Sequence, residues 1–173
     1  MKIRKLSRPE IEKFHLVFAK VIGDGFPEYS QELVDFIIEE DFKPGVLKEK
    51  LAKKEYTILV AEEEGQIVGF LIFEKLYGGV SYCPWLGVLR EFWRKGIGRQ
   101  LLVTWEEEIL REGGHKLMLL TQAEKNKIFY EKCGFTQEGL EKKSWFGLDA
   151  LIFGKIIGQP NPEIFYRKPY GEN

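Results

Sequence analysis

Cysteine is scarce in this chain of 173 residues, and so are histidine and methionine, with two residues of each type. The two cysteines, Cys83 and Cys133, are too few for a disulfide framework or for a cysteine-based zinc site. We therefore expect a protein of a reducing compartment, the cytoplasm, and we expect no bound metal.

The chain also lacks a strong charge of either sign and a long apolar run. Lysine and arginine total 26 residues against 27 acidic ones, for a net charge of −1. Because such a chain has no general attraction for a polyanion, we expect no nucleic-acid partner. The first ten residues, MKIRKLSRPE, lack the apolar core of a signal peptide, and no run is long enough to cross a bilayer. We therefore expect no membrane partner.

What the chain does contain is apolar material for one core. Hydrophobic residues make up 44% of it and aromatic residues 14%. This length suits one domain better than two. We expect the folded domain to cover residues 1–157. Residues 158–173 are rich in proline and aromatics and show no periodic signal, so we expect a tail that packs on the domain or on a neighbouring subunit of a homodimer.

Hydrophobic periodicity predicts the order of the elements. A short strand over 1–6 precedes three helices, which begin near Ser7, Ser30 and Pro44. Two strands, 56–61 and 67–73, should pair as a hairpin. The later expected strands cover 80–89, 115–121, 136–140 and 146–157, with helices over 98–113 and 125–132. Strand 80–89, the helix after it and strand 115–121 form a βαβ unit, so these two strands should be parallel.

The βαβ unit contains the main candidate site, in the stretch WLGVLREFWRKGIGRQLL at 85–102. The N–H groups at the start of a helix have no intrahelical acceptor and, with the helix dipole, attract anions. Gly96 and Gly98 lack a Cβ and let the backbone approach a ligand closely. Arg94, Lys95 and Arg99 add positive charge. This combination predicts a binding site for a pyrophosphate.

Two common nucleotide motifs do not fit this stretch. A P-loop requires Lys and then Ser or Thr after its last glycine, whereas Gly98 is followed by Arg99 and Gln100. A Rossmann fingerprint requires a third glycine and an acidic residue at the end of the next strand, and that strand ends in Leu-Thr-Gln at 120–122. A binder of another phosphorylated nucleotide is therefore the weaker interpretation.

The stretch resembles motif A of the GNAT N-acetyltransferase superfamily, Q/R-x-x-G-x-G/A, whose turn amides hold the pyrophosphate of acetyl-CoA. Gly96, Ile97 and Gly98 match it, whereas Trp93 replaces the first Gln or Arg and the cation follows at Arg94. A second stretch, FYEKCGF at 129–135, resembles the F/L-Y-E-K-x-G-F box of the same family.

The resemblance implies an α/β fold of the GNAT (acyl-CoA N-acyltransferase) type, with a bent mixed β-sheet, flanking helices and a central βαβ unit. It implies an enzyme that moves the acetyl group of acetyl-CoA to a primary amine, on a small molecule or a peptide, by direct attack in a ternary complex. The cofactor-binding residues it implies are Val88, Leu89, Arg94, Lys95, Gly96, Ile97, Gly98, Arg99 and Asn126. Asn126 enters because the family's usual Asn position holds Ala123 in this chain.

Tyr130 matches the residue that in many GNAT enzymes protonates or stabilises the CoA thiolate. The ordinary pKa of a tyrosine is about 10 and that of a thiol about 8.5, so complete proton transfer to the thiolate is uphill. We therefore expect Tyr130 to act by a hydrogen bond to the departing sulfur.

The proton acceptor for the amine is less well defined, because strand 80–89 contains no acid. Glu74, Asp24, Glu28 and Asp149 are open candidates. Asp24 and Glu28 lie on the loop that in this family borders the acceptor site, where two acids suit a cationic amine. The absent strand acid and the displaced Asn leave one alternative open, a catalytically inactive acyl-CoA-binding regulatory module.

Overall fold

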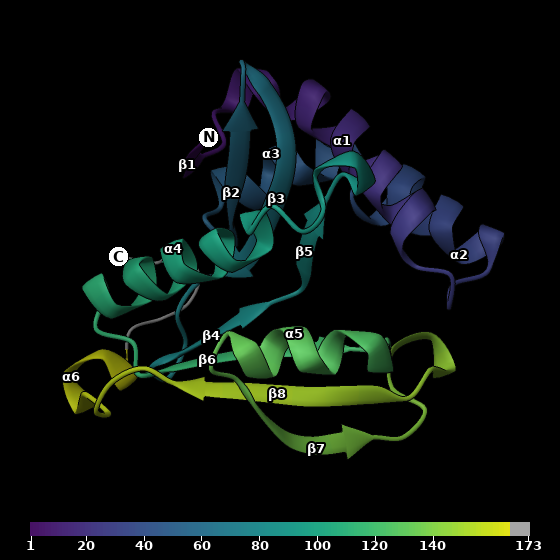
Figure 1. The fold of residues 1–173 in the computed structure, drawn as a ribbon. Coiled ribbons are helices and arrows are strands. Elements are labelled where there is room, and N and C mark those ends of the chain that lie inside the picture. The colour runs from purple at the N-terminus through teal and green to yellow at the C-terminus, as the bar shows by residue number, and fades with distance from the viewer. Residues whose placement is uncertain (167–173) are drawn as a thin grey trace.

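The computed structural model describes residues 1–166, which form two four-stranded sheets with helices packed against them (Figure 1). The helices are α1 Ile11–Gly25, α2 Gln31–Phe36, α3 Pro44–Ala52, α4 Ile97–Arg111, α5 Lys127–Lys132 and α6 Pro162–Phe165. The strands are β1 Lys2–Lys5, β2 Tyr56–Glu63, β3 Gln66–Glu74, β4 Val80–Cys83, β5 Trp85–Val88, β6 Lys116–Thr121, β7 Thr136–Glu141 and β8 Ala150–Ile156. A π-helical turn, Ile37–Asp41, continues α2.

The first sheet has the order β1-β2-β3-β5, and all of its strand pairs are antiparallel. Its β2–β3 hairpin turns on Glu64 and Gly65, which both have positive φ, as a two-residue hairpin turn requires. The second sheet has the order β4-β6-β8-β7, with β4 and β6 parallel. The expected α/β fold with its parallel βαβ unit is therefore confirmed.

The expected continuous strand over 80–89 is wrong. Cys83 ends β4 and Trp85 begins β5, and the two strands belong to different sheets. Pro84 lies between them, and it cannot donate to a ladder because it lacks an N–H. β6 extends to Thr121, beyond its last pairing with β4 at Leu119, so its C-terminal part and β5 face each other across an opening between the sheets.

Three further boundaries differ from the sequence prediction. The last strand starts at Ala150 and not at 146, because Phe146 adopts a φ of 58° in the tight turn Trp145–Gly147. The helix expected over 125–132 is a 3₁₀ turn, Glu124–Asn126, followed by α5. The tail contains the short helix α6, whose Ile164 is buried in the main core; residues 167–173 of the expected tail lie outside the described residues.

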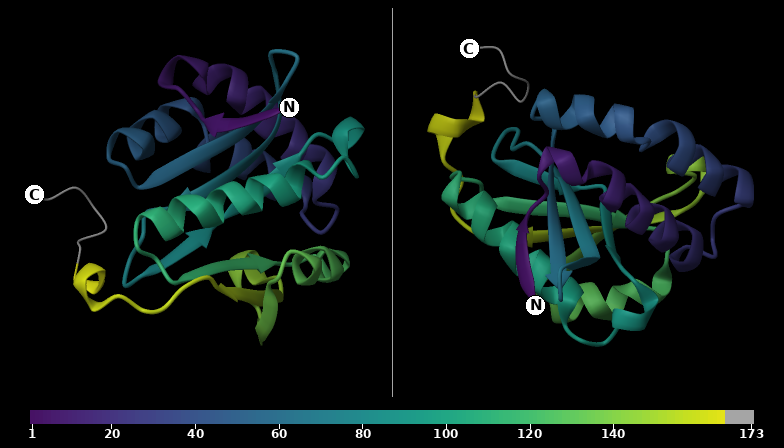
Figure 2. Two further views of the ribbon diagram at one scale, coloured as in Figure 1. Left: turned by 60° about the vertical axis from the view of Figure 1, so that its left-hand side comes forward. Right: turned by 90° about the horizontal axis from the view of Figure 1, so that it is seen from above.

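Helix α4 joins the two sheets and fixes the end of the glycine-containing loop that leads into it from β5 (Figure 2). Its Trp105 is fully buried, between Phe73 of β3 and Phe135, with ring centroids 6.3 Å away on each side. The Trp105 indole N–H donates to Ser81 Oγ of β4 at 3.0 Å. Burying one such side chain stabilises the fold by about 1.5–3 kcal/mol, so the N-terminus of α4 is firmly placed.

Helices α1 and α3 cover the opposite face of the first sheet, where Phe14, Phe18 and Phe70 form the centre of a second core. Within residues 1–166, no helix combines the length and the hydropathy that a bilayer span requires. In the same range, no group of His, Cys, Asp and Glu side chains is arranged to hold a metal ion.

Candidate functional site

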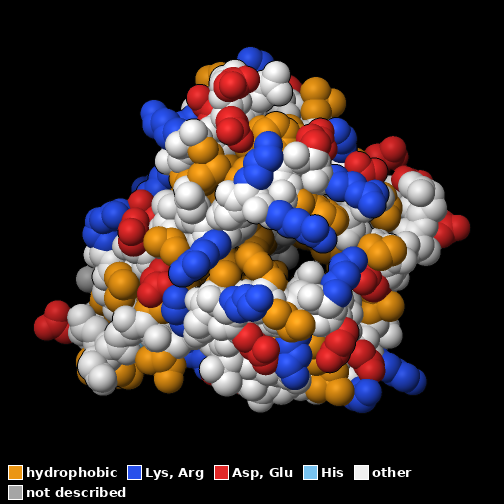
Figure 3. All heavy atoms as spheres, viewed as in Figure 1, with side chains coloured by type: hydrophobic (Ala, Val, Ile, Leu, Met, Phe, Trp, Pro, Cys, Tyr) orange, Lys and Arg blue, Asp and Glu red, His pale blue; other side chains and the backbone are white. Residues whose placement is uncertain are grey.

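A cleft of about 820 Å³ opens between the two sheets. Its walls come from the end of α1, from β5 and the loop after it, from the start of α4 and from α5. Lysine and arginine side chains surround the hollow at the centre of this face (Figure 3). Of the ten residues expected at the site, the lining contains Val88, Leu89, Arg94, Gly96, Ile97, Gly98, Arg99, Asn126 and Tyr130.

The loop before α4 has the geometry of an anion cradle. Arg94 and Gly96 both have left-handed φ values, 62° and 78°, and alternation of this kind turns successive N–H groups to one side. The first hydrogen bond of the helix runs from the Gln100 N–H to the Gly96 carbonyl at 3.1 Å. The N–H groups of residues 97–99 therefore precede it and have no helical acceptor. A pyrophosphate fits such a cradle.

Cations from distant parts of the chain gather at the same cleft. Besides Arg94 and Arg99, the lining includes Lys132 of the FYEKCGF box, and Lys20, Arg90 and Lys125, which belong to neither motif. Lys20 on α1 pairs with Glu91 at 2.8 Å, so it ties α1 to the loop after β5. Lys95 is the one expected site residue that is not part of the lining. Its ammonium group lies 4.5 Å from the centre of the Phe92 ring.

Strand β5 presents backbone groups to the cleft. The Leu89 N–H donates to the Val68 carbonyl of β3 at 2.9 Å, and successive residues of a strand direct these groups to opposite sides. The N–H and the carbonyl of Val88 therefore face the open edge. Trp93, whose side chain is 48% exposed, donates its indole N–H to that carbonyl at 2.7 Å.

Tyr130 lines the cleft from α5, which packs on the second sheet, and its side chain is largely buried. Its ring contacts Phe153 and Phe135, with centroid distances of 5.5 and 6.1 Å. Burial raises the pKa of Tyr130 above its usual value, so its hydroxyl stays protonated at neutral pH and remains a donor. Asn126 lies one turn earlier and donates to Thr121 Oγ1 at 3.2 Å, which fixes its amide beside Tyr130.

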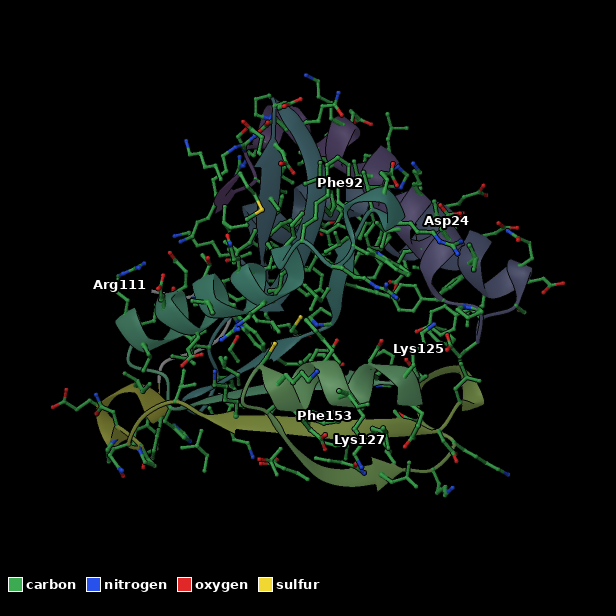
Figure 4. All side chains as sticks on the ribbon, in the orientation of Figure 1. Asp24, Phe92, Arg111, Lys125, Lys127 and Phe153 are labelled. Carbon is green, nitrogen blue, oxygen red and sulfur yellow. The ribbon has the colours of Figure 1, made fainter. Side chains whose placement is uncertain are left out.

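The candidate proton acceptors are not gathered together. Asp24 lines the cleft, on the side opposite Lys125 (Figure 4). Glu28, Glu74 and Asp149 are outside the lining. Asp149 pairs with Lys142 at 2.7 Å on the surface. Burial raises the pKa of Glu74. In the β2–β3 ladder, however, Glu74 is paired with Tyr56, away from the cleft.

A smaller chamber of about 50 Å³ adjoins the cleft. The two share Phe26, Leu86, Asn126 and Tyr130 as walls. Tyr29 and Gln122 line the chamber as well, and no motif pointed to either residue. Phe26 and Tyr29 are three positions apart in the loop before α2, so the sequence itself places these two aromatic residues close together.

Comparisons with known proteins agree with this geometry. Residues 54–137, from before β2 into β7, match the family model described as the acetyltransferase (GNAT) domain. That match confirms the resemblance drawn from the two sequence motifs. No curated protein sequence matches the chain.

Solved structures match over nearly the whole chain. PaiA N-acetyltransferase from Thermoplasma acidophilum, in complex with coenzyme A, has a TM-score of 0.79 at 23% identity, over 90% of this chain and 98% of that one. Ribosomal-protein-alanine N-acetyltransferase from Brucella melitensis has a TM-score of 0.71 at 24% identity, over 90% and 99%. YncA from Salmonella typhimurium, with its cofactor acetyl-CoA, has a TM-score of 0.71 at 19% identity, over 92% and 95%. These likenesses establish the shared fold.

Proposed function

The chain is a GNAT acetyltransferase, and we propose that it transfers the acetyl group of acetyl-CoA to a primary amine by direct attack in a ternary complex. The observation that carries the proposal is the continuity of the cleft. Its lining includes both the cation-rich cradle at Gly96 and the largely buried Tyr130. An anionic, elongated thioester suits both ends of this space.

The roles follow from position. The N–H groups at Ile97, Gly98 and Arg99, with the side chains of Arg94 and Arg99, hold the pyrophosphate. Lys95 contributes charge from just outside the lining. The edge groups of Val88, with Leu89 and Asn126 beside them, line the path toward Tyr130.

In the reaction, the amine nitrogen bonds to the thioester carbonyl carbon and the carbon–sulfur bond breaks. The Tyr130 hydroxyl donates a hydrogen bond to the departing sulfur. An alkylamine has a pKa of about 10.4 and must lose a proton before attack. Asp24, which lines the cleft, is our candidate to hold the ammonium group and take that proton through water.

The acceptor is a small-molecule or peptide amine, and the chain could act as a homodimer. The alternative function is an acyl-CoA-binding regulatory module without catalysis, which the absence of an acid on β4 and β5 favours.

The first test is calorimetric titration with acetyl-CoA, CoA, ATP and NAD. We expect acetyl-CoA and CoA to bind and the other two to bind far more weakly. The matched variant is Gly98→Glu, which places a carboxylate in the cradle; the Cβ it adds lies 3.2 Å from the Phe129 ring, so circular dichroism must confirm its fold. Release of CoA in the presence of amines then separates the enzyme from the regulatory module. If folded wild-type protein did not bind acetyl-CoA, the proposal would be wrong.

A further inference from the structure

One wall of the small chamber that adjoins the cleft at Tyr130 contains a hydrogen bond between the two halves of the fold. The Tyr29 hydroxyl donates to Gln122 Oε1 at 3.1 Å. Tyr29 belongs to the loop before α2, and Gln122 follows β6 of the second sheet. The pair therefore spans the opening where the sheets diverge, and it forms a wall of the chamber.

An aromatic cluster holds this wall in place. The Tyr29 ring stacks on Phe26, with centroids 5.3 Å apart and an angle of 13°, and both rings meet Trp85 edge-on. Trp85 in turn packs against Phe18 and Phe42 of the second core. Tyr29 is therefore attached to a rigid part of the molecule, although it lies in a loop.

The hydroxyl of Tyr29 remains a hydrogen-bond donor across the neutral pH range. Burial, with a smaller contribution from Glu28, raises the pKa of Tyr29 to about 12, so the phenol stays protonated across the neutral range. The other polar walls are also fixed, since Thr121 Oγ1 accepts from both Asn126 Nδ2 and the Ala123 N–H.

The chamber is small. An engineered apolar cavity of about 150 Å³ holds a benzene ring. The chamber has about a third of that volume, 50 Å³, which suits a group of two carbons and one oxygen. It joins the cleft at Tyr130, where the proposed function places the sulfur of the thioester.

Resting on the proposed function, we propose that this chamber receives the acyl group of the donor, and that Tyr29 and Gln122 restrict the donor to acetyl. A butyryl or hexanoyl chain meets the Tyr29–Gln122 wall and has to displace it. The two residues thus set donor specificity without taking part in the chemistry.

Donor binding tests this without knowledge of the amine. Calorimetry should compare CoA, acetyl-CoA, butyryl-CoA and hexanoyl-CoA on the full chain. We expect wild type to bind acetyl-CoA at least about tenfold more tightly than hexanoyl-CoA, as overpacking of a small site implies. Tyr29→Ala should reduce this ratio to about threefold or less by opening the wall. Tyr29→Phe keeps the ring and should retain most of the ratio.

Tyr77→Ala is the matched control, because Tyr77 is 65% exposed and lines neither space. Gln122→Ala opens the wall from the other side, in case Tyr29→Ala fails to fold. Equal affinity of wild type for all three esters, or ratios unchanged in both opened variants, would overturn this inference alone. Absence of binding for every ester would instead overturn the proposed function and this inference with it.

Discussion

Trp93 donates its indole N–H to the carbonyl of Val88 across 2.7 Å. The acceptor lies on the open edge of β5, facing the cleft, and Trp93 itself lines that cleft. The family motif has Gln or Arg at this position, so the indole is a particular feature of this chain. It covers a backbone group that an amide-bearing ligand in the cleft would use.

Removal of this indole N–H should strengthen donor binding. Trp93→Phe frees the Val88 carbonyl, and a net hydrogen bond contributes about 0.5–1.5 kcal/mol, so we expect acetyl-CoA to bind about two- to tenfold more tightly. Calorimetry measures the change. Trp145→Phe is the control, because Trp145 is 62% exposed and outside the cleft lining. Weaker binding by Trp93→Phe would mean that the indole itself contacts the ligand.

A side chain at Gly96 should reduce both stability and affinity. Gly96 has a φ of 78°, and an L-residue pays about 1–2 kcal/mol to adopt that left-handed conformation. Gly96→Ala should therefore lower the free energy of unfolding by about that amount and weaken acetyl-CoA binding by disturbing the cradle. Thermal melts and calorimetry measure the two effects.

Gly23→Ala is the matched glycine substitution. Gly23 lies inside α1, and no atom is within 4 Å of an added Cβ. Alanine in a helix is favoured over glycine by about 0.5–1 kcal/mol, so this variant should gain stability and keep its affinity. If Gly96→Ala proved as stable as wild type, the loop would not require the left-handed conformation.

The loss of folding stability at acidic pH should depend on Glu10. Hydrogen bonds from Arg4 and from the Ser7 hydroxyl lower the pKa of Glu10 to about 2. A lowered native pKa stabilises the fold above the unfolded pKa, and this stabilisation is lost as pH falls toward 2. Glu10→Gln should lose stability at pH 7 and show a shallower decline below pH 4.5 than wild type.

Urea unfolding at a series of pH values measures this slope. Glu49→Gln serves as the control, because Glu49 of α3 forms a solvent-exposed pair with Lys53 just after the helix, and exposed pairs contribute little. Parallel pH curves for wild type and Glu10→Gln would contradict the assignment.

The sequence predicts what depends on local pattern. Gly96 and Gly98 identify the cradle because the turn conformation and the helix start are encoded within a few residues. Asn126 lines the cleft together with Tyr130, because the two residues are one helical turn apart.

Features that depend on distant pairing were not predictable from the sequence. Pro84 interrupts a run of strand-forming residues, but only the pairing partners decide that each half enters a different sheet. Tyr29 and Gln122 are separated by 93 positions, and no local rule brings them together. The position of the Lys95 ammonium group over the Phe92 ring was not predictable either, because a motif gives the order of charges along a loop and not their direction.

Tyr130 offers the test that separates catalysis from packing. Tyr130→Phe keeps the ring contacts with Phe153 and Phe135 and removes only the hydroxyl. If that hydroxyl stabilises the departing thiolate, kcat should fall about 10²- to 10⁴-fold while the calorimetric affinity for acetyl-CoA stays unchanged. CoA release with an amine found by screening measures kcat.

Tyr82→Phe is the matched control for Tyr130→Phe. Burial raises the pKa of Tyr82 as well, yet Tyr82 lines neither the cleft nor the small chamber. Because burial raises the pKa of Tyr130, its hydroxyl should ionise at higher pH than an ordinary tyrosine, and wild-type activity should not decline through Tyr130 ionisation near neutral pH. A Tyr130→Phe variant with wild-type kcat would reduce this residue to a part of the core and leave the thiolate without a side-chain donor from α5.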